Sequence, residues 1–150
     1  MTVQHILVPT DFSADADRAL EYAITLAGTL HARVTLLHVL STLYWGTGDV
    51  PGVLPATFLD ELEAVTQQSM AQILQRVRHA GIEGEALVDY GSPYARIIAV
   101  AQEHNVDLIV MGSHGRTGLQ HILLGSVAER VVRLAPCPVL VTRGPAPGPA

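Results

Sequence analysis

This 150-residue chain contains no lysine, since its nine basic residues are all arginines. The absence of lysine excludes Schiff-base catalysis and the lysine-dependent phosphate-binding loop. Any phosphate that the protein binds must therefore be held by backbone N–H groups, hydroxyls or arginine. With 14 acids and a net charge of -5, the chain also lacks the broad basic surface that nucleic acids and anionic membranes attract.

Long apolar runs are missing as well. No stretch reaches the roughly 18 apolar residues that a transmembrane helix needs. Asp11, Asp15 and Asp17 interrupt the region where a signal peptide would carry its apolar segment, so we expect a soluble, cytoplasmic protein. The apolar fraction of 49% and the charged fraction of 15% exclude a disordered chain, and the length predicts about one domain.

Cysteine is nearly absent, because Cys137 is the only one and cannot form an internal disulfide. It lies between Pro136 and Pro138 in an apolar segment, without a basic neighbour in sequence that would make the thiol reactive. We expect a buried, structural thiol. The histidines form no H-E-x-x-H pattern and no cluster with cysteine, so the sequence predicts no zinc site.

Apolar patterning divides the chain into alternating strands and helices. The expected strands cover residues 6–8, 33–40, 85–89, 107–111 and 138–142. The expected helices cover about 14–30, with Ser13 as N-cap, 58–80, 126–134, and a segment that begins at Ser92-Pro93. This order predicts one α/β domain, a parallel sheet covered by helices on both faces. Residues 144–150 are expected to form a flexible tail.

Ligands of such sheets bind beyond the carboxyl ends of the strands, where the strand order reverses. Two segments are expected there: Pro9-Thr10-Asp11 after the first strand, and the loop from Gly112 to Gly125 after the fourth. The loop glycines allow backbone amides to approach an anion, and Gly125 stands directly before a helix whose free N–H groups favour phosphate. Arg116 adds the only fixed positive charge in the loop.

These features also have structural explanations. Ser126 and Glu129 fit a capping box, which needs no ligand, and Asp11 could simply form a turn. We expect His114 to face solvent and His38 to pack at the end of its strand. The Tyr44-Trp45 pair, in the connection before the second helix, could cover a ligand, contact a partner or pack locally.

Together these segments resemble the universal stress protein family. The resemblance is carried by Ile6-Leu7-Val8-Pro9-Thr10-Asp11-Phe12-Ser13, by Leu37-His38-Val39, and by the run from Val110 to Val141. That run contains the pattern G-x2-G-x9-G-[ST] at Gly112, Gly115, Gly125 and Ser126. The resemblance covers the chain except for the tail and about residues 41–58. It implies a doubly wound five-stranded sheet with the strand order 3-2-1-4-5 over residues 1–143.

The family's ATP-binding members carry this glycine pattern, so the resemblance implies that the chain binds ATP, alone or with Mg²⁺. Carried over residue by residue, Asp11 contacts the ribose or lies near the phosphates, and the backbone of Val39 reads the adenine edge. Met111 and Gly112 border the sugar. The phosphates are approached by Gly115 and Gly125 and held by Ser126 and Val127, and the remaining expected binding residues are Pro9, Thr10 and Arg116.

Nothing in the sequence is a dedicated base for ATP hydrolysis. We therefore predict no catalytic residues and a nucleotide-dependent stress regulator with at most slow hydrolysis. One alternative is a nucleotide-independent module that binds other proteins, and another is a slow ATPase or autophosphorylating protein. The resemblance further implies a homodimer through the edge strand at Pro138–Thr142, whose unpaired backbone would otherwise be a liability; a tail that covers this strand is the alternative.

Overall fold

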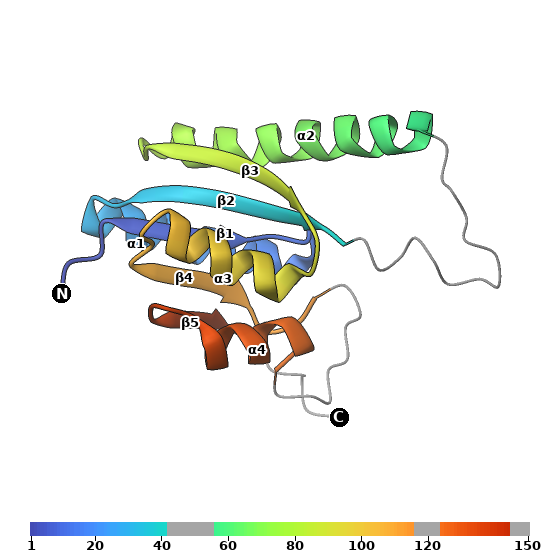
Figure 1. Ribbon diagram of the computed structural model, residues 1–150. Coiled ribbons are helices and arrows are strands. Elements are labelled where there is room, and N and C mark those ends of the chain that lie inside the picture. The colour runs from blue at the N-terminus through green and yellow to red at the C-terminus, as the bar shows by residue number, and fades with distance from the viewer. Residues whose placement is uncertain (42–55, 116–123, 145–150) are drawn as a thin grey trace, which may run out of the picture.

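Strands and helices alternate along the chain in the computed structural model, which describes residues 1–41, 56–115 and 124–144 (Figure 1). The strands are β1 (His5–Pro9), β2 (Arg33–Leu40), β3 (Gly84–Tyr90), β4 (Leu108–Gly112) and β5 (Val139–Thr142). The helices are α1 (Ala14–Leu30), α2 (Ala56–His79), α3 (Pro93–Glu103) and α4 (Ser126–Leu134). Each predicted strand and helix is present, with its ends shifted by about two residues or less.

The five strands form one parallel sheet in the order β3-β2-β1-β4-β5. This confirms the α/β fold class and the strand order 3-2-1-4-5. The first strand, β1, lies in the middle of the sheet. Strands β2 and β3 follow on one side of it, and β4 and β5 lie on the other side. The strand order therefore reverses between β1 and β4, where the carboxyl ends of the strands leave room for a ligand.

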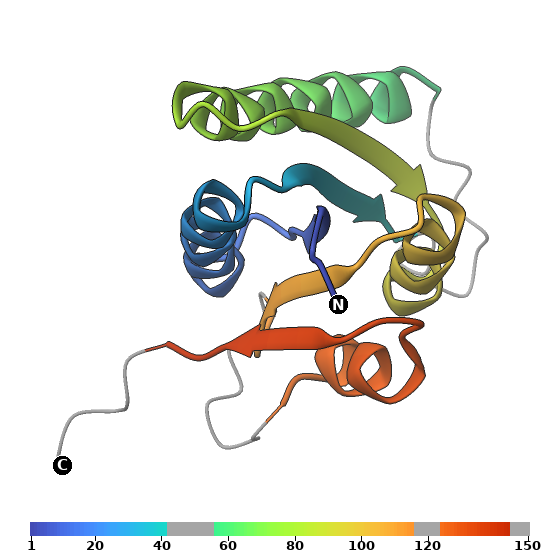
Figure 2. The same cartoon turned by 90° about the vertical axis from the view of Figure 1, so that its left-hand side faces the viewer.

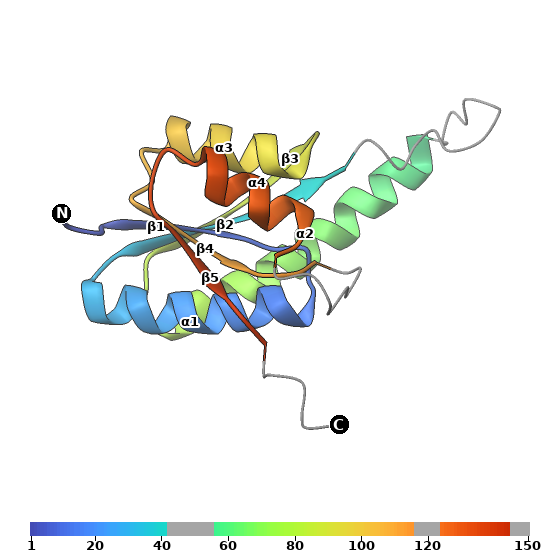
Figure 3. The ribbon, with the colours of Figure 1, turned by 90° about the horizontal axis from the view of Figure 1, so that it is seen from below.

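Helices cover both faces of the sheet, with α1 and α2 on one side and α3 and α4 on the other (Figures 2 and 3). Alternate residues of β1 enter the two cores, because side chains of a strand point to opposite faces. Ile6 and Val8 pack under α1 and α2, whereas Leu7 packs under α3 and α4. Burial on both sides explains why these strands are continuous apolar runs in the sequence.

Local signals start α1 as predicted. Ser13 is the N-cap, and its hydroxyl accepts a hydrogen bond from the N–H of Ala16 at 3.2 Å. Asp15 and Asp17 lie in the first turn, where a negative charge stabilises the helix dipole. No helix within the described residues is long and apolar enough to cross a lipid bilayer.

The prediction that Cys137 is buried is wrong, because its side chain is only partly buried. It packs against the core that lies beneath α3 and α4. It lies just before β5, the last strand of the sheet, where fewer neighbours surround it. Burial, with a smaller contribution from the charge of Asp107, raises the pKa of the thiol. A thiol with a raised pKa is a poor nucleophile, which agrees with a structural role.

Candidate functional site

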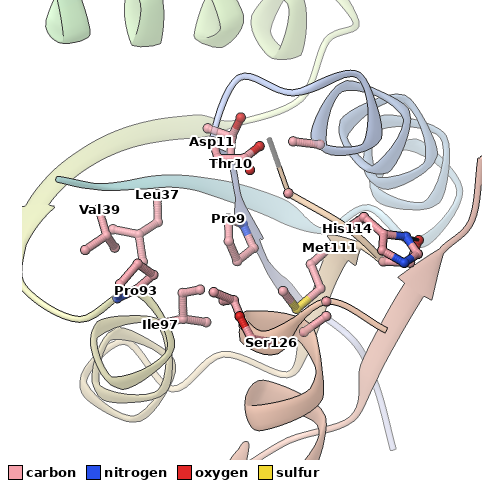
Figure 4. Close-up of a pocket in the computed structure, with 17 residues that line it drawn as sticks. Pro9, Thr10, Asp11, Leu37, Val39, Pro93, Ile97, Met111, His114 and Ser126 are labelled. Atoms are coloured by element: carbon pink, nitrogen blue, oxygen red, sulfur yellow. Dashed lines mark hydrogen bonds between the residues drawn. The ribbon is translucent and has the colours of Figure 1, made fainter. Parts of the chain in front are cut away.

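A cavity of about 290 Å³ lies at the carboxyl ends of β1 and β4 (Figure 4). Ten of the eleven predicted binding residues line it: Pro9, Thr10, Asp11, Val39, Met111, Gly112, Gly115, Gly125, Ser126 and Val127. Arg116, and the Tyr44-Trp45 pair, lie outside the described residues. The structure thus brings the two predicted segments together around one cavity, and the role of each residue in binding stays a prediction.

One side of the cavity is apolar. Leu37 and Val39 of β2 face Pro93 and Ile97 of α3 across it, as Figure 4 shows. Leu37, Pro93 and Ile97 were not among the predicted binding residues, yet two signals could have found them. Leu37 stands two residues from Val39 on one strand and so shares its face. Helix α3 follows β3, and helices of this fold begin at the carboxyl ends of the strands.

A tight turn after β1 places Asp11 on the cavity wall. The N–H of Ser13 donates to Asp11 Oδ1 at 3.0 Å, and the N–H of Phe12 donates to Thr10 Oγ1 at 3.1 Å. Phe12 adopts a left-handed backbone with φ of 62°, which is strained for a residue of its size. The structural alternative for Asp11 therefore holds, since it forms the turn, but the same residue also lines the cavity.

His38 on β2 holds this turn from the other face of the sheet. Its Nδ1 lies 2.8 Å from the carbonyl oxygen of Thr10, and its ring lies 4.5 Å from that of Phe12, centroid to centroid. As predicted, His38 packs at the end of its strand. It supports the cavity wall through Thr10 and Phe12.

The loop glycines lie where the chain packs closely, most of all at Gly112. A Cβ on Gly112 would lie 2.8 Å from the carbonyl carbon of Asp15, so only glycine lets β4 end this close to α1. A Cβ on Gly115 would lie 2.8 Å from Asp11 Oδ2, and one on Gly125 would lie 3.1 Å from the carbonyl oxygen of Ser113. At Gly112 and Gly115 the loop thus meets α1 and the turn after β1, and at Gly125 the two ends of the loop meet.

The prediction that His114 faces solvent is wrong. Its side chain is 21% exposed and turns toward α1, with Nδ1 at 2.9 Å from Ser113 Oγ and at 3.7 Å from Asp15 Oδ2. The backbone N–H of His114 donates to the same carboxylate oxygen at 3.2 Å. The loop is anchored to α1 by these contacts, which sequence spacing does not reveal because the partners are 99 residues apart.

The start of α4 differs from the capping-box prediction. Gly125 occupies the N-cap position with φ of -66° and ψ of 162°, and no side chain among the described residues caps the helix. Ser126 is the first residue inside the helix, so its hydroxyl is not in the N-cap position. Position 125 takes the N-cap role instead, where the backbone approaches Ser113 closely and glycine fits best. The first helical bond runs from the N–H of Glu129 to the carbonyl of Gly125 at 2.9 Å. The amides of residues 126–128 have no acceptor within the helix, and these residues line the cavity.

This arrangement suits a ligand with an apolar ring system and an anionic group. The apolar side formed by β2 and α3 can hold a flat ring, and the positive end of the α4 dipole stabilises negative charge. A model of the universal stress protein family matches residues 2–143 of the chain. The chain belongs to the universal stress protein family.

Relatives of this universal stress protein are similar over nearly their whole length. The universal stress protein YxiE of Bacillus subtilis is 33% identical over 144 residues, which cover 92% of this chain and 97% of YxiE. The solved structure of MJ0577, a universal stress protein of Methanocaldococcus jannaschii, superimposes with a TM-score of 0.87 at 31% identity. That match covers 98% of this chain and 100% of the MJ0577 chain.

A further relative was solved with a nucleotide. The universal stress protein from Archaeoglobus fulgidus in complex with dAMP is 25% identical and superimposes with a TM-score of 0.66. The match covers 94% of this chain and 98% of that protein. Nucleotides are therefore ligands of at least one solved protein of this fold and family.

Proposed function

We propose that this universal stress protein binds ATP in the cavity at the carboxyl ends of β1 and β4. The observation that supports this most is the amino terminus of α4, which no described side chain caps and whose first residues border the cavity. Helix amino termini bind phosphate through their free N–H groups and their dipole. The dAMP complex of the Archaeoglobus fulgidus relative supports the same class of ligand.

The lining suggests how ATP is oriented. Adenine packs in the apolar side, with the backbone of Val39 at its edge and Pro93 and Ile97 against its face. The ribose lies at Asp11, whose carboxylate accepts a ribose hydroxyl, and is bordered by Pro9, Thr10, Met111 and Gly112. The phosphates meet the amides of Ser126 and Val127 beside Gly115 and Gly125. We assign Arg116 to the phosphates as well, because it is positively charged and follows Gly115 directly in the sequence.

Charge favours ATP as its magnesium complex. Among the described residues that line the cavity there is one carboxylate, Asp11, and no arginine. A triphosphate beside Asp11 therefore needs a compensating positive charge. Mg²⁺ binds carboxylates and phosphate oxygens and keeps several waters, so it can be shared by Asp11 and the phosphates.

The cavity favours holding ATP over hydrolysing it. Hydrolysis requires a group that orients the attacking water and stabilises the charge of the transition state. Two candidate bases among the described residues line the cavity: Asp11 accepts the N–H of Ser13, and His114 turns its Nδ1 toward Ser113 and Asp15. We therefore propose a cytoplasmic stress regulator whose nucleotide state sets its shape or its partners, with at most slow hydrolysis.

A homodimer through Pro138–Thr142 is part of the same proposal. Strand β5 is the last strand of the sheet, and its residues are only partly buried. An edge strand of this kind has unpaired backbone groups that a second copy can bind. Light scattering on the wild-type protein tests this, since a monomer at micromolar concentration contradicts it.

A pair of substitutions at Ser126 tests the nucleotide site. Ser126→Pro removes one backbone N–H at the first position of α4, where proline is well tolerated, and the extended backbone of Gly125 suits a following proline. Ser126→Ala is the matched control, because it removes the hydroxyl and keeps the amide. Calorimetric titration with Mg-ATP should show roughly tenfold or more weaker binding for Ser126→Pro and a change of about twofold for Ser126→Ala.

The result also decides between the two candidate functions. If the wild-type protein gives no heat and no thermal shift with millimolar Mg-ATP, the nucleotide proposal is wrong. The alternative, a nucleotide-independent interaction module, is favoured by exposed apolar side chains near the start of α2, at Phe58, Leu59 and Val65. This part of α2 extends beyond the sheet, as Figure 1 shows. Pull-downs that give the same partners with and without ATP would support that alternative.

A further inference from the structure

Asp15 connects the first turn of α1 to the loop that follows β4. Its Oδ2 accepts a hydrogen bond from the backbone N–H of His114 at 3.2 Å and lies 3.4 Å from the hydroxyl of Ser113. The Asp15 side chain is 17% exposed, so these contacts are largely shielded from water. A partly buried carboxylate binds an N–H donor more strongly than a neutral oxygen does.

A second contact fixes the same two segments. The backbone of Asp15 lies so close to Gly112 that an added Cβ would be 2.8 Å from the Asp15 carbonyl carbon and 2.9 Å from its oxygen. The main chain of α1 and the end of β4 are therefore in direct contact. The carboxylate of Asp15 then extends this contact to the next two residues of the loop, Ser113 and His114.

The ring of His114 belongs to this contact. Its Nδ1 is 2.9 Å from Ser113 Oγ, and Ser113 itself is 2% exposed. Ser113 also accepts, through its carbonyl, the N–H of Gly125 at 2.6 Å. Asp15 thus acts on both ends of the loop: directly on His114, and through Ser113 on the residue that caps α4.

Electrostatics alone would make Asp15 unfavourable near an anion. Two like charges repel each other, and the repulsion is larger in a partly buried site than in water. An acid beside a phosphate site therefore weakens binding, unless it holds the site in the shape that the phosphate needs. The contacts of Asp15 with His114, Ser113 and Gly112 are of that second kind.

We infer that Asp15 is a positioning residue for the nucleotide site, because its carboxylate holds the loop after β4 in place. The inference rests on the proposed function. Asp15 binds the His114 amide and keeps Ser113 in reach of Gly125, so the amides at the start of α4 face the cavity before the ligand arrives. A preformed site binds more tightly, because no ordering of the loop has to accompany binding.

Three substitutions separate position from charge. Asp15→Ala removes both the acceptor and the charge, and the dissociation constant for Mg-ATP should rise roughly tenfold. Asp15→Asn keeps an acceptor oxygen for the His114 amide and removes the charge, so binding should stay within about threefold of the wild type. Asp15→Glu keeps the charge but places the carboxylate one methylene farther from α1, where it no longer fits the His114 amide, so binding should weaken. This variant tests the role of Asp15 even if the alanine variant does not fold.

Asp17→Ala is the matched control. Asp17 lies in the same first turn of α1, but its carboxylate pairs with Arg76 of α2 and makes no hydrogen bond with the described residues of the loop. Its loss should leave the affinity for Mg-ATP within about twofold. Amide hydrogen exchange at His114, followed by NMR, provides a readout without ligand: it should be faster in Asp15→Ala and Asp15→Glu than in Asp15→Asn, where a weaker acceptor remains, and unchanged in Asp17→Ala.

The outcomes distinguish the role of Asp15 from the proposed function itself. Equal or tighter binding by Asp15→Ala or Asp15→Glu, with a wild-type protein that binds Mg-ATP, would overturn the role of Asp15 alone. Loss of affinity in Asp15→Asn equal to that in Asp15→Ala would also overturn it, because the effect would then follow charge. A wild-type protein that binds no Mg-ATP overturns the proposed function, and the role of Asp15 in it as well.

Discussion

Two aspartates link distant segments at opposite ends of the sheet: Asp107 links β4 to β1, and Asp15 links α1 to the loop after β4. At the amino end, Asp107 accepts the backbone N–H groups of Gln4 and His5 at 2.9 and 3.0 Å. At the carboxyl end, Asp15 accepts the N–H of His114 at 3.2 Å. Both carboxylates link segments about 100 residues apart in the chain, and the cavity described above lies at the carboxyl end, beside Asp15.

The difference lies in what surrounds each aspartate. At the amino end the polar groups bind one another: buried His5 lies 2.7 Å from Thr35 Oγ1, which donates to Glu85 at 2.8 Å. At the carboxyl end the first residues of α4 line the cavity, and no side chain of the described residues caps that helix. The same carboxylate–amide contact therefore stabilises a closed region at one end and an open, ligand-sized region at the other.

The largest expected effect is that of Gly112→Ala, which would break the carboxyl end. The new methyl group would lie within 2.9 Å of the Asp15 backbone, so β4 or α1 has to move. We expect a loss of about 3 kcal/mol in the free energy of unfolding, seen as a fall of about 6–12 °C in Tm. Gly28→Ala is the control, since a Cβ there has nothing within 4 Å and should be neutral or stabilising. Equal melting temperatures for the two variants would contradict the close packing at Gly112.

The next effect in size is that of Asp107→Ala, which separates the two aspartates by function. It leaves two backbone amides without their acceptor, so we expect a loss of about 2 kcal/mol in urea unfolding. Binding of Mg-ATP to the remaining folded protein should be unchanged, because Asp107 lies at the end of the sheet away from the cavity. A loss of affinity as large as that expected for Asp15→Ala would remove the distinction between the two ends.

The amino end also contains a titratable group whose hydrogen bonds conflict. Nδ1 of His5 lies 3.1 Å from the carbonyl oxygen of His104 and 3.1 Å from a guanidinium nitrogen of Arg33. A neutral ring nitrogen either donates or accepts, so it cannot satisfy both neighbours. Burial, followed by the charge of Arg33, lowers the pKa of His5 below 6.5.

His5→Gln therefore tests the closed end through its pH dependence. Protonation favours the unfolded chain, where the His5 pKa is higher. As the pH falls through about 6.5, the unfolded state takes up a proton that the native state does not, so stability decreases until the lower native pKa is reached. His5→Gln should lose about 1 kcal/mol at pH 8 and depend less on pH between about 8 and 5. His79→Gln, at an exposed position of α2, should keep the wild-type dependence; an unchanged slope for His5→Gln would contradict the assignment.

The sequence predicts the fold and the place of the site well, for a physical reason. Period and capping are local properties, so Ser13 and the apolar run of β4 could be recognised without the structure. The carboxyl-end rule then predicted that Asp11 and the loop after β4 lie together. Sequence alone did not show which polar group binds which, because the contacts of Asp15 and Asp107 depend on how distant segments pack.

Ser126 and His114 show where local rules fail. The S-x-x-E spacing is that of a capping box, but the close approach of Gly125 to Ser113 moves the N-cap back by one residue. A histidine between glycines in a loop is expected in water, but a carboxylate on α1 binds its backbone. In both cases a contact across the cavity wall overrides the local preference, which is typical of a functional site.

The smallest expected effect, that of Arg18→Ala, sharpens the assignment of Asp15. Arg18 pairs with Asp15 Oδ1 from the solvent side, and its side chain is 42% exposed. An exposed pair at this helical spacing contributes little and is screened by salt, so we expect a loss of less than about 0.5 kcal/mol in urea at low ionic strength and none at 0.5 M NaCl. The affinity for Mg-ATP should change by less than about twofold, because Asp15 Oδ2 still binds His114. If Arg18→Ala instead weakens binding as much as Asp15→Ala, Asp15 acts through its ion pair on α1, and the loop contact is not what positions the site.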